Sequence, residues 1–222
     1  NLPPVSGEIA SALSLLSSAE HLLGESQRAR EHAARAAEIH RVLSGDADPT
    51  YAFALNNLGT ILSQLAEHGE AEACFLRAQA IYTSSFGAES ARLVWPLVNL
   101  GELYRQTGEF EKGIASLERA AQIAEAAYGP AHSEVGSALI NLGLLEIVAG
   151  RAGDARAHLE RGLEIKVVTD GPESPNVAIT LLALGHLLGP LGETARAESL
   201  LVRGMAICAK TYGPDNLRME SF

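Results

Sequence analysis

Residues 51–82 read YAFALNNLGTILSQLAEHGEAEACFLRAQAIY, and this stretch decides the fold. Its first half places Leu55, Leu58 and Leu62 three and four residues apart, which is the spacing of one face of an α-helix. A break at residues 67–69 follows. The helical spacing then returns in a second apolar set: Ala71, Phe75, Ala78 and Tyr82. The stretch therefore predicts two helices joined by a short turn.

The same two-helix pattern recurs along the chain at a constant step of 42 residues. Leucine keeps this step in the first helix of each unit: Leu13, Leu55, Leu97, Leu139 and Leu181. Isoleucine, glycine and arginine series keep it as well, without an insertion or deletion. Such self-similarity predicts an array of stacked repeats. We expect one repeat domain over residues 1–222, with repeats at about 8–45, 46–87, 88–129, 130–171 and 172–213 and the start of a truncated sixth repeat at 214–222.

Small residues in the same register indicate where helices approach each other closely. One series lies inside the first helix of four units: Gly59, Gly101, Gly143 and Gly185. Glycine in a helix interior costs about 1 kcal/mol relative to alanine, so its retention needs a packing reason. We expect that a larger side chain at these places would force two helices apart.

Composition and charge exclude several classes of function. The chain has 222 residues with 27 acidic and 17 basic side chains, a formal charge of -10, which argues against nucleic acid as a partner. We expect no membrane span, because no run of 18 apolar residues occurs, and the start of the sequence lacks the features of a secretory signal. With two cysteines and no disulfide framework, a cytoplasmic location is the expectation.

Motifs for catalysis or metal binding are missing from the sequence. No H-E-x-x-H or C-x-x-C occurs, and the seven histidines show no metal-ligand spacing. No glycine-rich phosphate loop follows a predicted strand. We therefore expect no enzyme activity, no cofactor and no metal site.

The pair Leu58-Gly59, followed by Ala71, Phe75 and Ala78, resembles the tetratricopeptide repeat (TPR). The usual period of that repeat is about 34 residues. The 42-residue form, with its Gly-Pro linkers, looks like the repeats of kinesin light chains. The resemblance covers about residues 8–222 and implies an all-α fold, a right-handed superhelical α-α solenoid of five TPR helix pairs. It also implies that the first helix of each pair faces the concave side.

One place in the repeat departs from the family pattern. Members usually carry an aromatic residue three positions after the glycine of the first helix, and here only Tyr104 keeps it. The other units carry Glu20, Leu62, Glu146 and Leu188 at that place.

Candidate partner-binding residues follow from the resemblance, because the family binds ligands at concave positions of the first helix. These positions supply amides, one acidic side chain, one basic side chain, apolar side chains and one histidine. The candidates are Asn56, Asn57, Asn99, Glu102, Arg105, Asn141, Leu144, Ile147 and His186.

The asparagines Asn57, Asn99 and Asn141 are in register, and two interpretations of them stay open. They could form a ladder of amides that hydrogen-bond to the backbone of an extended peptide, as the resemblance implies. They could instead link neighbouring helices of the solenoid. Leu144 and Ile147 have a similar ambiguity, as an apolar anchor for a ligand or as packing residues.

The main functional hypothesis is a non-catalytic module that binds a peptide or helix of a partner protein in its concave groove. One alternative is a structural scaffold or oligomerisation arm that self-associates through the solenoid ends. Another is a set of sensor repeats in a larger bacterial signalling protein.

Overall fold

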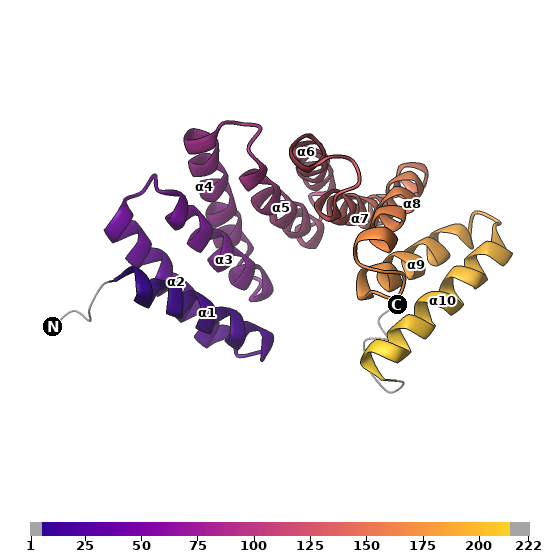
Figure 1. Ribbon diagram of the computed structural model, residues 1–222, viewed down its shortest axis with the longest axis horizontal. Helices are drawn as coiled ribbons and strands as arrows, with labels where there is room; N and C mark the ends of the chain where they lie inside the picture. Colours follow the sequence, from indigo (N-terminus) through magenta and orange to yellow (C-terminus); the bar gives the residue numbers. More distant parts are fainter. Residues whose placement is uncertain (1–5, 214–222) are drawn as a thin grey trace. The chain divides into compact units, whose positions relative to one another are not determined.

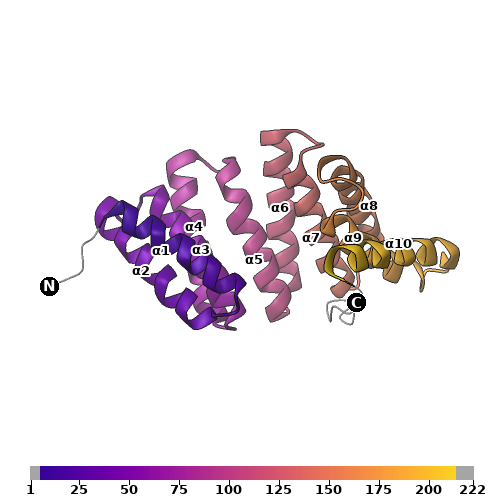
Figure 2. The ribbon, with the colours of Figure 1, turned by 60° about the horizontal axis from the view of Figure 1, so that its bottom comes forward.

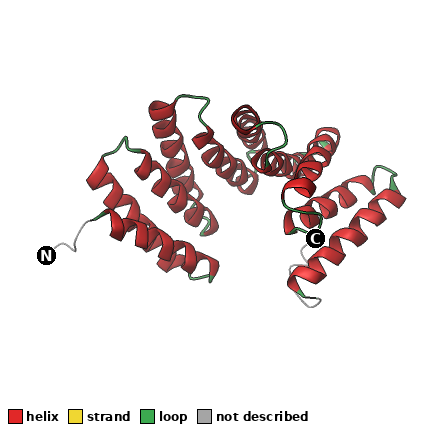
Figure 3. Ribbon diagram, in the orientation of Figure 1, coloured by secondary structure: helices red, strands yellow, loops and turns green. Residues whose placement is uncertain are grey.

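The computed structural model describes residues 6–213, which form ten α-helices and no β-strand (Figure 1, Figure 3). The predicted all-α fold of five helix pairs is confirmed. The expected start of a sixth repeat at 214–222 lies outside the described residues. The helices are α1 (Gly7–Leu22), α2 (Ser26–Ser44), α3 (Pro49–Gln64), α4 (His68–Phe86), α5 (Val94–Thr107), α6 (Phe110–Tyr128), α7 (Ser133–Val148), α8 (Ala152–Thr169), α9 (Pro175–Leu188) and α10 (Thr194–Tyr212).

A side-chain cap precedes the first helix of four pairs, and in the third pair the cap precedes a short 3₁₀ turn ahead of α5. Such a side chain accepts a hydrogen bond from a backbone N–H of the first turn, which has no acceptor within the helix. Asp48 Oδ1, for example, accepts from the N–H of Thr50 at 2.8 Å. The caps recur at the 42-residue step: Ser6, Asp48, Ser90, His132 and Ser174. This register explains why the helical turns of all five pairs, η1 (Ala91–Leu93) included, start at equivalent places.

The third pair starts later because of Pro96. A 3₁₀ turn, η1 (Ala91–Leu93), precedes α5, so the α-helix begins after the place that the register of α3 and α7 would give it. Pro96 then lies in the first turn of α5, where a missing N–H breaks no intrahelical hydrogen bond. The position of Pro96 therefore accounts for the late start of α5.

The turn inside each pair needs one residue with a left-handed φ. Glycine fills this place in four pairs, with φ between 77° and 87°: Gly24, Gly108, Gly150 and Gly192. In the second pair the residue is Ala66, with φ of 59°, and no other non-glycine residue in 6–213 has a positive φ. The turn therefore lies slightly before the break expected at residues 67–69, and an alanine is held there in a conformation that disfavours side chains.

Residues Asn1–Gly108 form the first of two compact units, with α1 to α5 in its described part. Consecutive helices contact each other, and the first helices of neighbouring pairs, α1 with α3 and α3 with α5, are also in contact (Figure 2). Phe75 lies at the centre of the core between α3, α4 and α5, together with Leu62, Leu100 and Tyr104. A smaller cluster of Ala29, Ala33 and Ile61 joins α2 to α3.

Residues Glu109–Phe222 form the second unit, with α6 to α10 in its described part. Its consecutive helices also pack in order, and α7 contacts α9. One cluster between α7, α8 and α9 includes Ile140, Leu159 and Leu184. A second cluster between α9 and α10 includes Leu181 and Ile207.

Close approach of helices at glycine is confirmed in both units. A Cβ on Gly59 would lie 2.6 Å from Cε1 of Phe75, and one on Gly143 would lie 2.6 Å from Cγ of Leu159. Gly185 has the same relation to Leu201. Because these separations are shorter than a van der Waals contact, a larger residue would need the helices to move apart.

Candidate functional site

The first helices of the pairs in the first unit, α1, α3 and α5, expose a row of large apolar side chains. Leu15 on α1 is 74% exposed, Phe53 on α3 is 54% exposed and Trp95 on α5 is 63% exposed. Phe53 and Trp95 occupy the same place one repeat apart. Because exposed apolar groups that gather on one face mark interaction surfaces, this face is the candidate site.

Two cavities lie on this face. The first cavity has a volume of about 590 Å³, and the second has a volume of about 310 Å³. The first cavity is lined by Ser11, Ser14, Leu15, His40, Pro49, Thr50, Phe53 and Arg92. The second is lined by Ser18, His21, Leu22, Asn56, Asn57, Thr60, Ile61, Trp95 and Asn99. We call the surface made by the two cavities the α1–α3 groove.

The charges of the α1–α3 groove differ from those of the chain as a whole. The chain has a net charge of -10, yet no Asp or Glu is among the residues that line the two cavities. The titratable side chains in the lining are Arg92, His40 and His21. Arg92 also lies over the ring of Phe86, 4.8 Å from its centroid. An acidic ligand would therefore meet no carboxylate in the lining.

Asn56 and Asn99 are joined to each other. Asn99 Nδ2 donates to Asn56 Oδ1 at 3.0 Å, with a longer contact of 3.4 Å to the hydroxyl of Thr60. Asn56 is only 4% exposed. This bond links α3 to α5, so Asn99 makes the kind of contact that the interpretation of the asparagine series as links between helices describes.

Asn57 is in a different situation from Asn99. It is half-buried and lines the second cavity, and its side chain makes no hydrogen bond to any residue in 6–213. An amide has two donors and an acceptor, so Asn57 retains its full capacity for a ligand. Asn99 differs because its Nδ2 already donates to Asn56 and Thr60.

Glu102 and Arg105 form an ion pair on the exposed side of α5. Arg105 donates two hydrogen bonds to Glu102, at 2.8 and 2.7 Å, and Gln106 donates a third. Burial opposes the charge of Glu102, but these hydrogen bonds outweigh it and lower the pKa of the carboxyl. The hydrogen bond to Glu102 raises the pKa of Arg105. The two candidate charges thus neutralise each other in the absence of a ligand.

The remaining candidates lie in the second unit. Leu144 and Ile147 on α7 are half-buried and pack against the cluster that contains Leu184 and Leu187 of α9. Asn141 is half-buried, without a hydrogen bond from its side chain to another residue in the described part of the chain, and His186 is exposed. The packing of Leu144 and Ile147 against α9 corresponds to the structural interpretation of these two residues.

Sequence reasoning missed two buried carboxylates. Glu146 is 2% exposed, and its Oε2 lies 2.8 Å from Nδ1 of His158. Glu20 makes the equivalent contact with His32 at 2.6 Å. Burial raises the pKa of Glu146, and the hydrogen bond with His158 offsets part of this rise. Each acid stands where the family has an aromatic residue, and each histidine lies twelve residues later, so the matched Glu–His spacing was the available signal.

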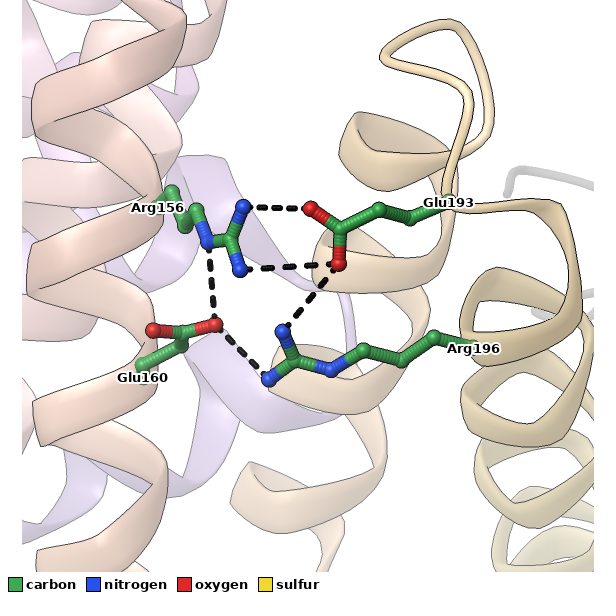
Figure 4. A network of polar contacts seen from close by, with 4 residues as sticks. All are labelled: Arg156, Glu160, Glu193 and Arg196. Carbon is green, nitrogen blue, oxygen red and sulfur yellow. Dashed lines mark hydrogen bonds and ion pairs between the residues drawn. The ribbon is translucent and has the colours of Figure 1, made fainter.

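A ring of four charged side chains joins α8 to the start of α10 (Figure 4). Arg156 contacts Glu193 at 2.5 Å and Glu160 at 3.2 Å, and Arg196 contacts the same two acids at 3.3 and 2.7 Å. The hydrogen bond from Arg156 lowers the pKa of Glu193. Because every charge in the ring is paired, we assign these residues to holding the two helices together.

Elsewhere in residues 6–213, few side chains are arranged for metal binding or nucleophilic catalysis. No group of three or more His, Cys, Asp or Glu side chains there is placed to hold a metal ion, and no helix of that part is long and apolar enough to cross a membrane. Cys74 and Cys208 are free thiols. Burial raises the pKa of Cys74 to about 11, so at neutral pH its thiol is protonated and a weak nucleophile.

Comparison with known proteins gives the same repeat. The profile of the family described as Tetratricopeptide repeat matches residues 8–84, 92–167 and 134–210. No curated protein sequence gives a significant match.

Solved structures of similar fold include two of the kinesin light chain type. BtubC (BKLC) from P. vanneervenii superposes with a TM-score of 0.80 at 21% identity, over 95% of this chain and 84% of that chain. A putative kinesin light chain from Podosopora anserina with nearly identical TPR-like repeats has a TM-score of 0.75 at 19% identity, over 93% and 98%. A Rap protein complexed with competence and sporulation factor has a TM-score of 0.76 at 15% identity, over 94% and 56%. At these identities the likeness establishes the fold.

Proposed function

Because the chain belongs to the tetratricopeptide repeat family, whose general role is protein–protein interaction, we propose that it is a non-catalytic module that binds a peptide or helix of a partner protein in the α1–α3 groove. The observation that carries the proposal is the row of exposed apolar side chains beside two cavities of about 590 and 310 Å³. Concave, mainly apolar sites with a few placed polar groups are where ligands bind.

The groove residues take distinct roles in this proposal. Phe53 and Trp95 bury the apolar side chains of the ligand, since large aromatic residues contribute most to interface energies. Asn57 supplies a free amide to the ligand backbone. Asn56 and Asn99 hold α3 and α5 at the spacing that forms the second cavity.

The second unit, taken by itself, offers a separate candidate surface with residues at equivalent places. Asn141 has the register of Asn57, and its side chain has no hydrogen-bond partner within residues 6–213. Leu144, Ile147 and His186 are proposed to border Asn141 as secondary contacts.

In the first unit, Glu102 and Arg105 are proposed to exchange their mutual ion pair for charges of the ligand. One neighbour of the same fold, the Rap protein, has been solved with a bound factor, which supports a ligand-holding role for such helix pairs.

A second candidate is self-association through the exposed side of α10. Val202 and Met205 on that helix are exposed large apolar side chains. Sedimentation velocity over a concentration series tests it. Self-association predicts a dimer that Val202→Lys abolishes, and a monomer at every concentration contradicts it.

The main proposal is tested with a library of random 16-residue peptides selected against the full chain. We expect the affinity of an enriched peptide to fall about tenfold or more for Phe53→Ala and for Asn57→Ala, as for residues that contribute 1–2 kcal/mol to an interface. The matched control is Leu76→Ala, which truncates an exposed apolar side chain on α4. Equal affinity for Phe53→Ala and wild type, with both folded, would contradict the proposal.

A further inference from the structure

We infer that the α1–α3 groove binds its partner as an amphipathic α-helix lying along α1 and α3, with two apolar side chains seven residues apart in the two cavities. The inference rests on the proposed function and adds the conformation of the ligand, its spacing and its charge. Its basis is the periodicity of the two linings.

On both α1 and α3, each residue that lines the first cavity has a counterpart seven positions later that lines the second cavity. On α1, Ser11, Ser14 and Leu15 line the first cavity, and the residues seven positions later line the second: Ser18, His21 and Leu22. On α3, Pro49, Thr50 and Phe53 line the first cavity, and Asn56, Asn57 and Thr60 line the second. Seven residues are two turns of an α-helix, a rise of about 10.5 Å, so the cavities repeat at that distance along the groove.

A helical ligand matches this distance and a β-strand does not. In a helix parallel to α1 and α3, residues i and i+7 project from the same face about 10.5 Å apart. In a strand, side chains on one face are about 6.6 or 13.2 Å apart, so two of them cannot enter both cavities. Residues seven apart in a strand also point to opposite faces. The periodicity therefore selects a helix-in-groove mode of recognition.

The sizes and linings of the cavities set the side chains that each accepts. The first cavity, with Leu15, Pro49 and Phe53 in its wall, has room for a large apolar or aromatic side chain. The second cavity is about half as large and carries amides beside Trp95, so a smaller apolar side chain with a polar neighbour fits it.

Charge complementarity selects an acidic helix. Arg92 and His40 border the first cavity and His21 borders the second, whereas neither lining contains Asp or Glu. An acidic side chain beside the first anchor would meet Arg92 at the edge of the groove. A second copy of this acidic chain would bring its net charge of -10 against an equal charge. The occupant is therefore an acidic amphipathic helix of another protein.

Two matched peptide libraries test the inference. Both are 16 residues long on a background of Glu, Gln and Ala, and both vary two positions among large apolar residues. The first library varies positions 5 and 12, and the second varies positions 5 and 10, which lie far apart around a helix. Trp95, the one tryptophan of the chain, reports binding by a blue shift of its fluorescence.

We expect binders from the first library only, with affinity reduced about tenfold or more by Phe53→Ala and by a proline between the two anchors of the peptide. The Leu76→Ala control should bind like wild type. Equal yields from the two libraries, tolerance of the central proline, or no binder from either library would overturn the helix inference. The proposed function fails separately, if peptides from the random library bind independently of Phe53 and Asn57.

Discussion

Asn57 and Asn99 occupy the same place in successive repeats but should respond oppositely to alanine substitution. Asn99 donates to Oδ1 of Asn56, which is almost fully buried, so Asn99→Ala removes the bond and leaves that oxygen without its partner. Asn57 makes no hydrogen bond to another residue in the described part of the chain. The two variants therefore separate an amide that links helices from an amide that is free for a ligand.

The expected magnitudes follow from these contacts. Loss of one partner of a buried hydrogen bond costs about 1–3 kcal/mol, so Asn99→Ala should lower the free energy of unfolding by that amount. Asn57→Ala loses no bond and gains helix propensity, so its effect should lie between about zero and 0.7 kcal/mol of stabilisation. For peptide binding we expect the order to reverse, with Asn57→Ala the more harmful variant in a folded protein.

Urea unfolding followed by Trp95 fluorescence is the assay, because Trp95 lies in the first unit and reports on α5. Asn141→Ala, in the second unit, is the matched control and should leave this transition unchanged. Equal losses of stability for Asn57→Ala and Asn99→Ala, or no loss for Asn99→Ala, would refute the reasoning.

Three further predictions concern packing, backbone and pH. Gly143→Ala should destabilise by about 1–3 kcal/mol in calorimetry because its new Cβ would overlap Leu159, whereas Gly153→Ala, with open space around it, should be neutral or stabilising; equal effects would contradict the close approach. Ala66→Gly should stabilise by about 0.5–1 kcal/mol in urea unfolding by relieving the positive φ, and a destabilised variant would count against this. Burial raises the pKa of Glu146 in the folded state, so the folded protein holds this proton more tightly than the unfolded chain does. The resulting contribution to the free energy of unfolding is present below about pH 4.5 and is lost as pH rises through the raised pKa. The stability of Glu146→Gln relative to wild type should therefore increase over the same pH range, and a constant or falling difference would refute it.

The fold could be predicted because its signals are local and periodic. The 42-residue step carries the caps, the leucine rows and the glycines together, and glycine at a place such as Gly143 reports directly on a tight contact. The late start of α5 agrees with Pro96, because proline is tolerated in the first turn of a helix and not in its interior. Alanine itself carries no signal for the left-handed conformation of Ala66, which only its register with Gly24 and Gly108 indicates.

The site was less predictable because side-chain contacts between repeats depend on rotamers that register does not determine. Register placed Asn57 and Asn99 as equals. Of the two, however, only Asn99 hydrogen-bonds to the preceding repeat, where its partner is the buried Asn56 of α3. The apolar candidates from the sequence were Leu144 and Ile147 of the fourth repeat, whereas Leu15 and Phe53 border the first cavity. Whether such a side chain is covered depends on its neighbours in the adjacent pair, which the period alone does not give.

Site-specific photo-crosslinking tests the central claim most directly. A photoreactive phenylalanine at position 53, beside the first cavity, and one at position 76, on α4, are compared with the same enriched peptide bound to the full chain. We predict that mass spectrometry finds the peptide attached at position 53 and not at position 76. Attachment at position 76 without attachment at position 53 would contradict binding in the α1–α3 groove.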